Sequence, residues 1–278
     1  MKTVIITGGN SGIGYQASKQ LAKLEYRVIM VCRNEKSAQK ACDNIRNETT
    51  NLHVDYMIAD LADSNSVKNV AENLIKSEWS IDALVNNAAD FDISNKVPQF
   101  NAGNIEKQFA TNVVAPFLLS ELLMPKLQQV QGKIINISTQ GLMVYPNISL
   151  EFDNLNAELS YKPDQVYYQN KLALLMVSLY QRRKYPQVTI HAVRVTNVKI
   201  DITKYENLSW KLKQLYRIKS FFSIQPAVMA QTYTKLIQEQ YNGFLYNEKM
   251  KEVKANKAAY DMEKQEQLYK ILQKIVTK

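Results

Sequence analysis

A tyrosine and a lysine four positions apart, Tyr167 and Lys171, are the pair of side chains in this sequence best suited to acid–base chemistry. On a helix, residues at i and i+4 share one face, so the two polar groups can converge. A lysine cation beside a phenol favours the phenolate and lowers the phenol pKa from about 10. Hydride transfer to a carbonyl carbon needs such a proton donor for the oxygen. An exposed Tyr–Lys surface pair is the alternative, and Tyr168 is a rival phenol three positions from the lysine.

Four of the eight glycines lie between positions 8 and 14. They follow the β-branched run Val4-Ile5-Ile6-Thr7 and precede a helix-like stretch from Tyr15 to Leu24. Glycine lets the backbone adopt positive φ and approach a ligand closely. In a strand–turn–helix context, backbone N–H groups and the helix N-terminus can bind a pyrophosphate. The spacing Gly8-x-x-x-Gly12-x-Gly14 therefore predicts dinucleotide binding, with a plain turn as the alternative.

Strand-like and helix-like segments alternate along the rest of the chain, which predicts βαβ units and a parallel sheet. The expected later strands are Arg27–Val31, Val54–Ile58, Ala83–Val85, Lys133–Ile137, Val188–Val195 and Gly243–Tyr246. The expected helices are Lys36–Arg46, Ser64–Lys76, Asn104–Met124 with a bend at Pro116, and Gln165–Arg183, with further helices between 200 and 240. We expect one α/β domain over residues 1–278, a Rossmann-like doubly wound sheet with helices on both faces. It would include a substrate lid at about 196–224 and a helical tail at about 258–277.

The turn TGGNSGIG at 7–14 resembles the T-G-x-x-x-G-x-G cofactor motif of the short-chain dehydrogenases/reductases. Further matches follow in that family's order: ADL at 59–61, NNAA at 86–89, TNV at 111–113, INIST at 135–139 and YYQNK at 167–171. The resemblance spans most of the chain. The residues Ala259-Tyr260-Asp261 and Leu268-Tyr269 are similar to the C-terminal end of the retinol-dehydrogenase-like branch. The gap of 28 positions between Thr139 and Tyr167 is also similar to that branch.

The resemblance implies four catalytic residues: Asn112, Thr139, Tyr167 and Lys171. It makes Tyr167 the acid/base and gives Lys171 the nicotinamide ribose to hold. Thr139 would orient the carbonyl oxygen, and Asn112 would keep a water-linked proton path to the lysine. Thr139 stands where the family usually has the second of two serines, and its extra methyl predicts a narrower substrate pocket. Ser138 is the reserve candidate, although adjacent strand residues point to opposite faces.

Three departures from the family pattern leave a second interpretation open. Ala89 replaces a preferred glycine, Asn170 replaces a frequent serine, and the usual Pro-Gly after the sixth strand is absent, with Val195-Thr196-Asn197-Val198 in its place. Those backbone groups normally face the nicotinamide amide. The alternative is therefore a catalytically impaired regulatory protein that keeps the fold and binds the cofactor.

The end of the second strand predicts NADP(H) as the cofactor. An NAD enzyme is expected to have an acidic residue there for the ribose 2′-OH, but this chain has Cys32 followed by Arg33. The guanidinium can pair with a 2′-phosphate, unless Arg33 is only a solvated surface charge. The full set of expected cofactor-binding residues is Gly8, Asn10, Ser11, Gly12, Ile13, Gly14, Arg33, Asn34, Asp60, Leu61, Asn87, Ala88, Tyr167, Lys171, Asn197 and Val198.

The remaining composition bears on substrate, metal sites and location. Two cysteines and two histidines, the latter expected in strand-like runs, make a zinc site or histidine triad a poor fit. The formal charge of +9 is spread along the chain, so binding to nucleic acid or anionic membranes is a minor alternative to a small-molecule carbonyl or alcohol substrate. We expect a cytoplasmic protein without a transmembrane segment, and the resemblance allows a homo-oligomer.

An aromatic-rich pocket predicts an apolar substrate. Three segments should shape it: Asp90–Val97, Leu142–Phe152 and Thr196–Ile224. Their large side chains are Phe91, Met143, Tyr145, Phe152, Tyr205, Trp210, Tyr216, Phe221 and Phe222, which could equally pack as lid or core.

Overall fold

Seven parallel strands form one sheet in the computed structural model, which describes residues 1–92, 95–199 and 223–277. The order across the sheet is β3-β2-β1-β4-β5-β6-β7. The strands are β1 (Thr3–Thr7), β2 (Arg27–Cys32), β3 (Val54–Ile58), β4 (Ala83–Asn86), β5 (Lys133–Thr139), β6 (Thr189–Val195) and β7 (Leu245–Tyr246). Each neighbouring pair runs parallel. This order is that of a doubly wound Rossmann-type sheet, so the predicted α/β fold is confirmed.

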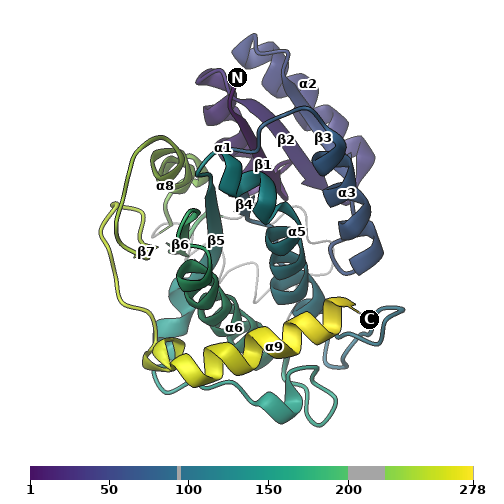
Figure 1. Cartoon of the computed structure of the whole chain (residues 1–278), viewed down its shortest axis with the longest axis vertical. Coiled ribbons are helices and arrows are strands. Elements are labelled where there is room, and N and C mark those ends of the chain that lie inside the picture. Colours follow the sequence, from purple (N-terminus) through teal and green to yellow (C-terminus); the bar gives the residue numbers. More distant parts are fainter. Residues whose placement is uncertain (93–94, 200–222, 278) are drawn as a thin grey trace.

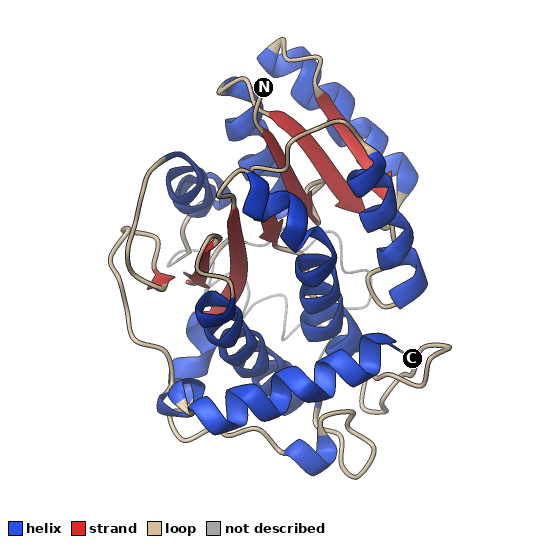
Figure 2. Ribbon diagram, in the orientation of Figure 1, coloured by secondary structure: helices blue, strands red, loops and turns tan. Residues whose placement is uncertain are grey.

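Helices cover both faces of the sheet (Figures 1 and 2). They are α1 (Gly12–Lys23), α2 (Glu35–Thr49), α3 (Ser64–Lys76), α4 (Lys107–Phe109), α5 (Ala115–Gln129), α6 (Pro163–Lys184), α8 (Pro226–Gln238) and α9 (Met262–Thr277). Helices α1, α2 and α8 pack on one face, and α3, α5 and α6 pack on the other. The C-terminal helix α9 crosses α6 on its outer side (Figure 1).

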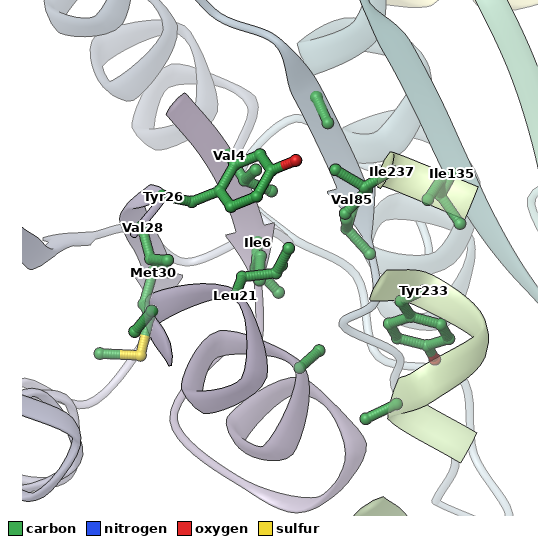
Figure 3. Packing of buried hydrophobic residues seen from close by; sticks show 14 of the residues in the cluster. Val4, Ile6, Leu21, Tyr26, Val28, Met30, Val85, Ile135, Tyr233 and Ile237 are labelled. Atoms are coloured by element: carbon green, nitrogen blue, oxygen red, sulfur yellow. The ribbon is translucent and has the colours of Figure 1, made fainter. Parts of the chain in front are cut away.

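The apolar runs seen in the sequence account for this layering. All five residues of β1 are buried, as expected for a central parallel strand covered on both faces. In α1, the buried residues recur at helical spacing, so one face of the helix packs on the sheet. Figure 3 shows Leu21 of α1 and Tyr233 of α8 over the strand residues Ile6 and Val85. The carboxyl end of β1, which the glycine turn follows, therefore packs on one continuous apolar core.

Three local expectations need correction. The helix expected over Asn104–Met124 is divided into α4, a π-helical turn at Ala110–Val114, and α5. Pro116 lies in the first turn of α5, where a missing N–H is tolerated, so the irregularity precedes it. His53 lies outside the strands and is exposed, whereas His191 is buried in β6.

Part of the expected substrate pocket lies outside the described residues. This part includes 93–94 and 200–222, and with them Tyr205, Trp210, Tyr216, Phe221 and Phe222. In the described portion of the chain, no helix combines the length and apolar character needed to span a bilayer.

Candidate active site

The candidate site lies at the carboxyl ends of the central strands. Strand β1 has β2 on one side and β4 on the other, so the chain order reverses across the β1–β4 pair. In open α/β sheets, ligands bind at such a switch point. The glycine turn follows β1, Asn87 follows β4, and Thr139 ends β5.

Tyr167 and Lys171 lie on α6, as their spacing predicts. Lys171 is only 2% exposed, and its Nζ donates a hydrogen bond of 2.9 Å to the main-chain oxygen of Ile137. The same Nζ lies 5.7 Å from the centroid of the Tyr167 ring. Burial lowers the pKa of Lys171 to about 8, because a charged ammonium is poorly solvated there. The helix thus brings the lysine head beside the phenol and anchors it to β5.

The Tyr167 ring is packed between two other rings. Its centroid lies 4.2 Å from that of Phe91 and 5.4 Å from that of Tyr168. Burial raises the pKa of the Tyr167 phenol. The neighbouring Tyr168 phenol acts in the same direction, so the direction of the shift is opposite to the lowering expected from the Lys171 cation. Tyr167 is therefore protonated at neutral pH.

The hydroxyls of Ser138 and Thr139 differ in their surroundings. The Ser138 Oγ is buried and has no hydrogen-bond partner among the described residues. The Thr139 Oγ1 accepts a hydrogen bond of 3.1 Å from the Gly141 N–H, at the start of a 3₁₀ turn over Gln140–Val144. Since this contact uses an acceptor site, the Thr139 hydroxyl hydrogen can still be donated elsewhere. This geometry favours Thr139 over Ser138 as the hydroxyl that orients a carbonyl.

Asn112 lies in the π-helical turn and is fully buried. Its Oδ1 accepts a hydrogen bond of 2.9 Å from the Asp90 N–H, and its Nδ2 donates one of 2.8 Å to the Asp90 oxygen. The side chain therefore holds the segment that leads to Phe91. Departures from regular α-helix of this kind often occur at functional sites.

The glycine turn has the geometry of a ligand cradle. Gly8 and Gly12 have positive φ, +65° and +56°. A Cβ atom on Gly12 would meet no heavy atom within 4 Å, so that side of the turn is open. A Cβ on Gly14 would instead lie 2.6 Å from the Asn87 Nδ2, which leaves no space for a larger residue. The turn is thus closed against β4 and open toward the N-terminus of α1.

Two residues brace this turn from within the sheet. The Thr7 Oγ1 accepts hydrogen bonds of 3.0 Å from the N–H groups of Asn87 and Ala88. The Asn87 Nδ2 donates to the Thr7 oxygen at 2.9 Å. The ends of β1 and β4 are therefore linked directly beneath the glycines.

A sequence profile for short chain dehydrogenases matches residues 2–150, from the first strand through the cradle and Thr139. The chain belongs to the short-chain dehydrogenase family. It is 32% identical to mouse (Mus musculus) retinol dehydrogenase 13 over 251 residues, covering 87% of this chain and 73% of the relative. It is 28% identical to human polyprenol dehydrogenase over 284 positions, covering 96% of this chain and 83% of the relative. These similarities support the assignment of the chain to the retinol-dehydrogenase-like branch of the family.

The fold similarity extends to solved structures of low sequence identity. A short-chain dehydrogenase from Sphingobium yanoikuyae, solved in complex with NADPH, superposes with a TM-score of 0.65 at 17% identity. The match covers 100% of this chain and 96% of that one.

At the end of β2, the chain has a cluster of polar side chains that the sequence alone did not reveal. Asn10, from the glycine turn, donates a hydrogen bond of 2.7 Å from Nδ2 to the Ser37 Oγ. Asn34 caps α2 by accepting from the Ser37 N–H at 2.9 Å, so its side chain is committed to the helix start. Arg33 is exposed beside them. The contact of Ser37 with the glycine turn could not be predicted, because nothing marks a serine inside a predicted helix as the partner of a distant residue.

Four other residues expected to bind the cofactor make local contacts within the protein or lie at its surface. The Asp60 carboxylate accepts a hydrogen bond of 3.0 Å from the Ala62 N–H, so it closes a local turn. Leu61 is half-buried next to it, and Ile13 packs on the core beneath α1. Ser11 precedes α1 and is exposed, without a side-chain capping bond.

Where the family's usual Pro-Gly is missing, the chain forms a short parallel bridge. Val198 pairs with Ile224, and the Asn197 oxygen accepts a hydrogen bond of 2.9 Å from the Ile224 N–H. Thr196 donates from its hydroxyl to the Gln140 Oε1, which joins the ends of β5 and β6. These contacts define the described edges of the expected lid.

Proposed function

We propose that this chain is an NADP(H)-dependent oxidoreductase of the carbonyl reductase or alcohol dehydrogenase type, with Tyr167 as the acid/base. The observation that carries the proposal is the junction between α6 and β5. There Lys171 is hydrogen-bonded to Ile137, two residues before Thr139, and its head lies beside the Tyr167 ring. A proton donor, a cation and an orienting hydroxyl therefore come from two adjoining elements.

The residues around the glycine turn fit a dinucleotide. The open side of Gly12 and the free start of α1 offer N–H groups to a pyrophosphate, and Arg33 offers a planar set of donors to a 2′-phosphate. The rest of the pyrophosphate cradle would consist of Gly8, Asn10, Ser11, Ile13 and Gly14. The residues that would border the adenosine are Asn34, Asp60, Leu61, Asn87 and Ala88. Those that would border the nicotinamide are Asn197 and Val198. When bound, NADP(H) would supply or accept the hydride.

The protein's own residues would manage the proton and the orientation of the substrate. At neutral pH the half-buried Tyr167 phenol carries its proton, which suits it to protonate a carbonyl oxygen during reduction. Lys171, with a pKa of about 8, is still mostly charged at pH 7 and stabilises the phenolate that results. Its ammonium has three donors, and the bond to Ile137 uses one, so two are left for ribose hydroxyls. Thr139 would donate to the same carbonyl oxygen, and Asn112 would keep the Asp90 segment in position.

An apolar carbonyl or alcohol is the substrate class that we propose. Phe91, Met143 and Tyr145 belong to the segments expected to line the pocket, and each is more than one-third exposed. Exposed large apolar side chains near a site favour an apolar ligand. The names of the similar proteins, a retinol dehydrogenase and a polyprenol dehydrogenase, refer to apolar isoprenoid alcohols.

The test is NADPH oxidation by the purified protein with a panel of retinaldehyde, citral and nonanal, with glyceraldehyde as the polar control. We expect turnover with apolar aldehydes. We expect Tyr167→Phe to abolish turnover while fluorescence titration shows unchanged NADPH binding. Turnover at the wild-type rate in Tyr167→Phe would show that the acid/base assignment is wrong. NADPH binding without turnover of any aldehyde would favour the regulatory alternative.

A further inference from the structure

Tyr168, the phenol next to the proposed acid/base, occupies the space between the two elements that carry Thr139 and Tyr167. We propose that the Tyr168 ring is a positioning group that sets the separation between the Thr139 hydroxyl and the Tyr167 hydroxyl. This inference rests on the roles proposed above for those two residues. It assigns Tyr168 a function through its ring, whereas its hydroxyl takes no part in the reaction.

The first contact of the ring is with Gly141, just after β5. A Cβ atom on Gly141 would lie 2.7 Å from the Tyr168 Oη and 2.9 Å from its Cζ, and closer still to Cε1. Side-chain carbons do not approach other atoms so closely, so even one methyl group at Gly141 would force the ring or the turn to move. The glycine is therefore required by the ring that lies on it.

Gly141 connects this contact to Thr139. Its N–H donates the hydrogen bond of 3.1 Å to the Thr139 Oγ1, which leaves the hydroxyl hydrogen available to a substrate. A displaced turn would lengthen or break this bond. The position of the Tyr168 ring is thereby transmitted to the orientation of the Thr139 hydroxyl.

The second contact is with Tyr167 itself. The two rings meet edge to face, with an interplanar angle of 72° and 5.4 Å between centroids. On its outer side Tyr168 packs on Tyr145, 4.8 Å away between centroids, which confines the ring. Tyr168 therefore lies between Gly141, whose N–H is bonded to Thr139, and the ring of Tyr167.

The experiment is a double-mutant cycle of Gly141→Ala and Tyr168→Ala, read as kcat and KM for the best aldehyde of the panel and as the Kd of NADPH. Gly141→Ala should lower kcat roughly 100-fold, because small misplacements of reacting groups have effects of that order. In the Tyr168→Ala background, the added methyl meets no ring, and Gly141→Ala should change kcat by no more than about twofold. The Kd of NADPH should be unchanged throughout.

Two further variants distinguish positioning from general stability. Tyr168→Phe keeps the ring and should retain wild-type kcat, whereas Tyr168→Ala alone should lower it. Tyr180→Ala removes a ring from the same helix, one that stacks on Tyr269 at 4.4 Å instead, and should leave kcat unchanged. If Gly141→Ala fails to fold, the comparison of Tyr168→Phe with Tyr168→Ala decides the matter.

An equal loss from Gly141→Ala in both backgrounds, or wild-type kcat in Tyr168→Ala, would overturn the inference and leave the proposed function intact. A loss of kcat in Tyr168→Phe would also overturn it, because the hydroxyl would then be the active part. Absence of turnover in the wild-type protein would overturn the proposed function and this inference together.

Discussion

Lys171 and Ile137 are joined by a hydrogen bond of 2.9 Å from the Lys171 Nζ to the Ile137 main-chain oxygen. The bond connects helix α6 to strand β5 at the level of the candidate site. It also gives a polar partner to an ammonium group that is almost fully buried. Burial of a cation with a neutral partner is costly, which is why the pKa of Lys171 falls to about 8. Such a cost is commonly retained where a perturbed group has a function.

Lys171→Met should change how stability depends on alkaline pH. The lysine has a pKa of about 8 when folded and an ordinary value of 10.5, so the unfolded chain binds more protons between these values. The free energy of unfolding should therefore rise with pH across this interval, by about 3 kcal/mol, in the wild type but not in Lys171→Met. Urea denaturation of both proteins from pH 7 to 10.5 measures the difference. Parallel profiles would show that Lys171 keeps an ordinary pKa in the folded state.

Thr139 and Ser138 provide a matched pair of substitutions. Thr139→Ala should lower kcat roughly 100-fold, the typical effect of losing a donor to a developing oxyanion. Thr139→Ser should keep activity and accept bulkier ketones, since only the methyl is lost. Ser138→Ala should retain full activity and fold at least as stably, because the Ser138 hydroxyl is buried without a partner in the part of the chain that the structure describes. The reverse pattern in steady-state kinetics would transfer the role to Ser138.

Arg33→Ala should weaken NADPH binding much more than NADH binding. A guanidinium–phosphate contact contributes about 1.5–3 kcal/mol, so a loss of roughly tenfold to 100-fold in NADPH affinity is expected. Lys40→Ala, an exposed cation one turn into α2, should leave both affinities unchanged. Fluorescence titrations with each nucleotide provide the measurement. Equal weakening for NADPH and NADH would exclude a 2′-phosphate contact by Arg33.

His191 should make the fold sensitive to acid. It is fully buried, its Nδ1 lies 2.9 Å from the Gly243 oxygen, and burial lowers its pKa to about 4. The unfolded chain takes up a proton below about pH 6.5, whereas the folded chain does so only near pH 4. Stability should thus fall by about 3 kcal/mol as the pH drops through this interval. His191→Asn keeps a donor for Gly243 but cannot titrate, so its stability relative to the wild type should improve toward pH 4.

The order of elements and the place of the cradle could be predicted from the sequence because they depend on local patterns. The β-branched run before Gly8 and the apolar periodicity after Gly14 define a strand and a helix without any long-range contact. Helix α3 begins at Ser64 and ends at Lys76, as predicted, since Asp63 caps it. By contrast, the helix expected to continue from Asn104 is interrupted by a π turn, and within this turn Asn112 makes a tertiary contact with Asp90 that no local pattern reveals.

By itself, the sequence determined the α/β fold class, the position of the glycine turn after the first strand, and the family motifs that contain Tyr167, Lys171 and Thr139. Only the tertiary structure decided how far those three side chains are removed from water and which other side chains pack around them. Burial raises the pKa of the Tyr167 phenol, and the Tyr168 ring lies on Gly141, 27 residues earlier in the chain. The physical reason is that desolvation and packing depend on all atoms around a group. Those atoms come from α6, the turn after β5 and the Phe91 segment, which are brought together only by folding.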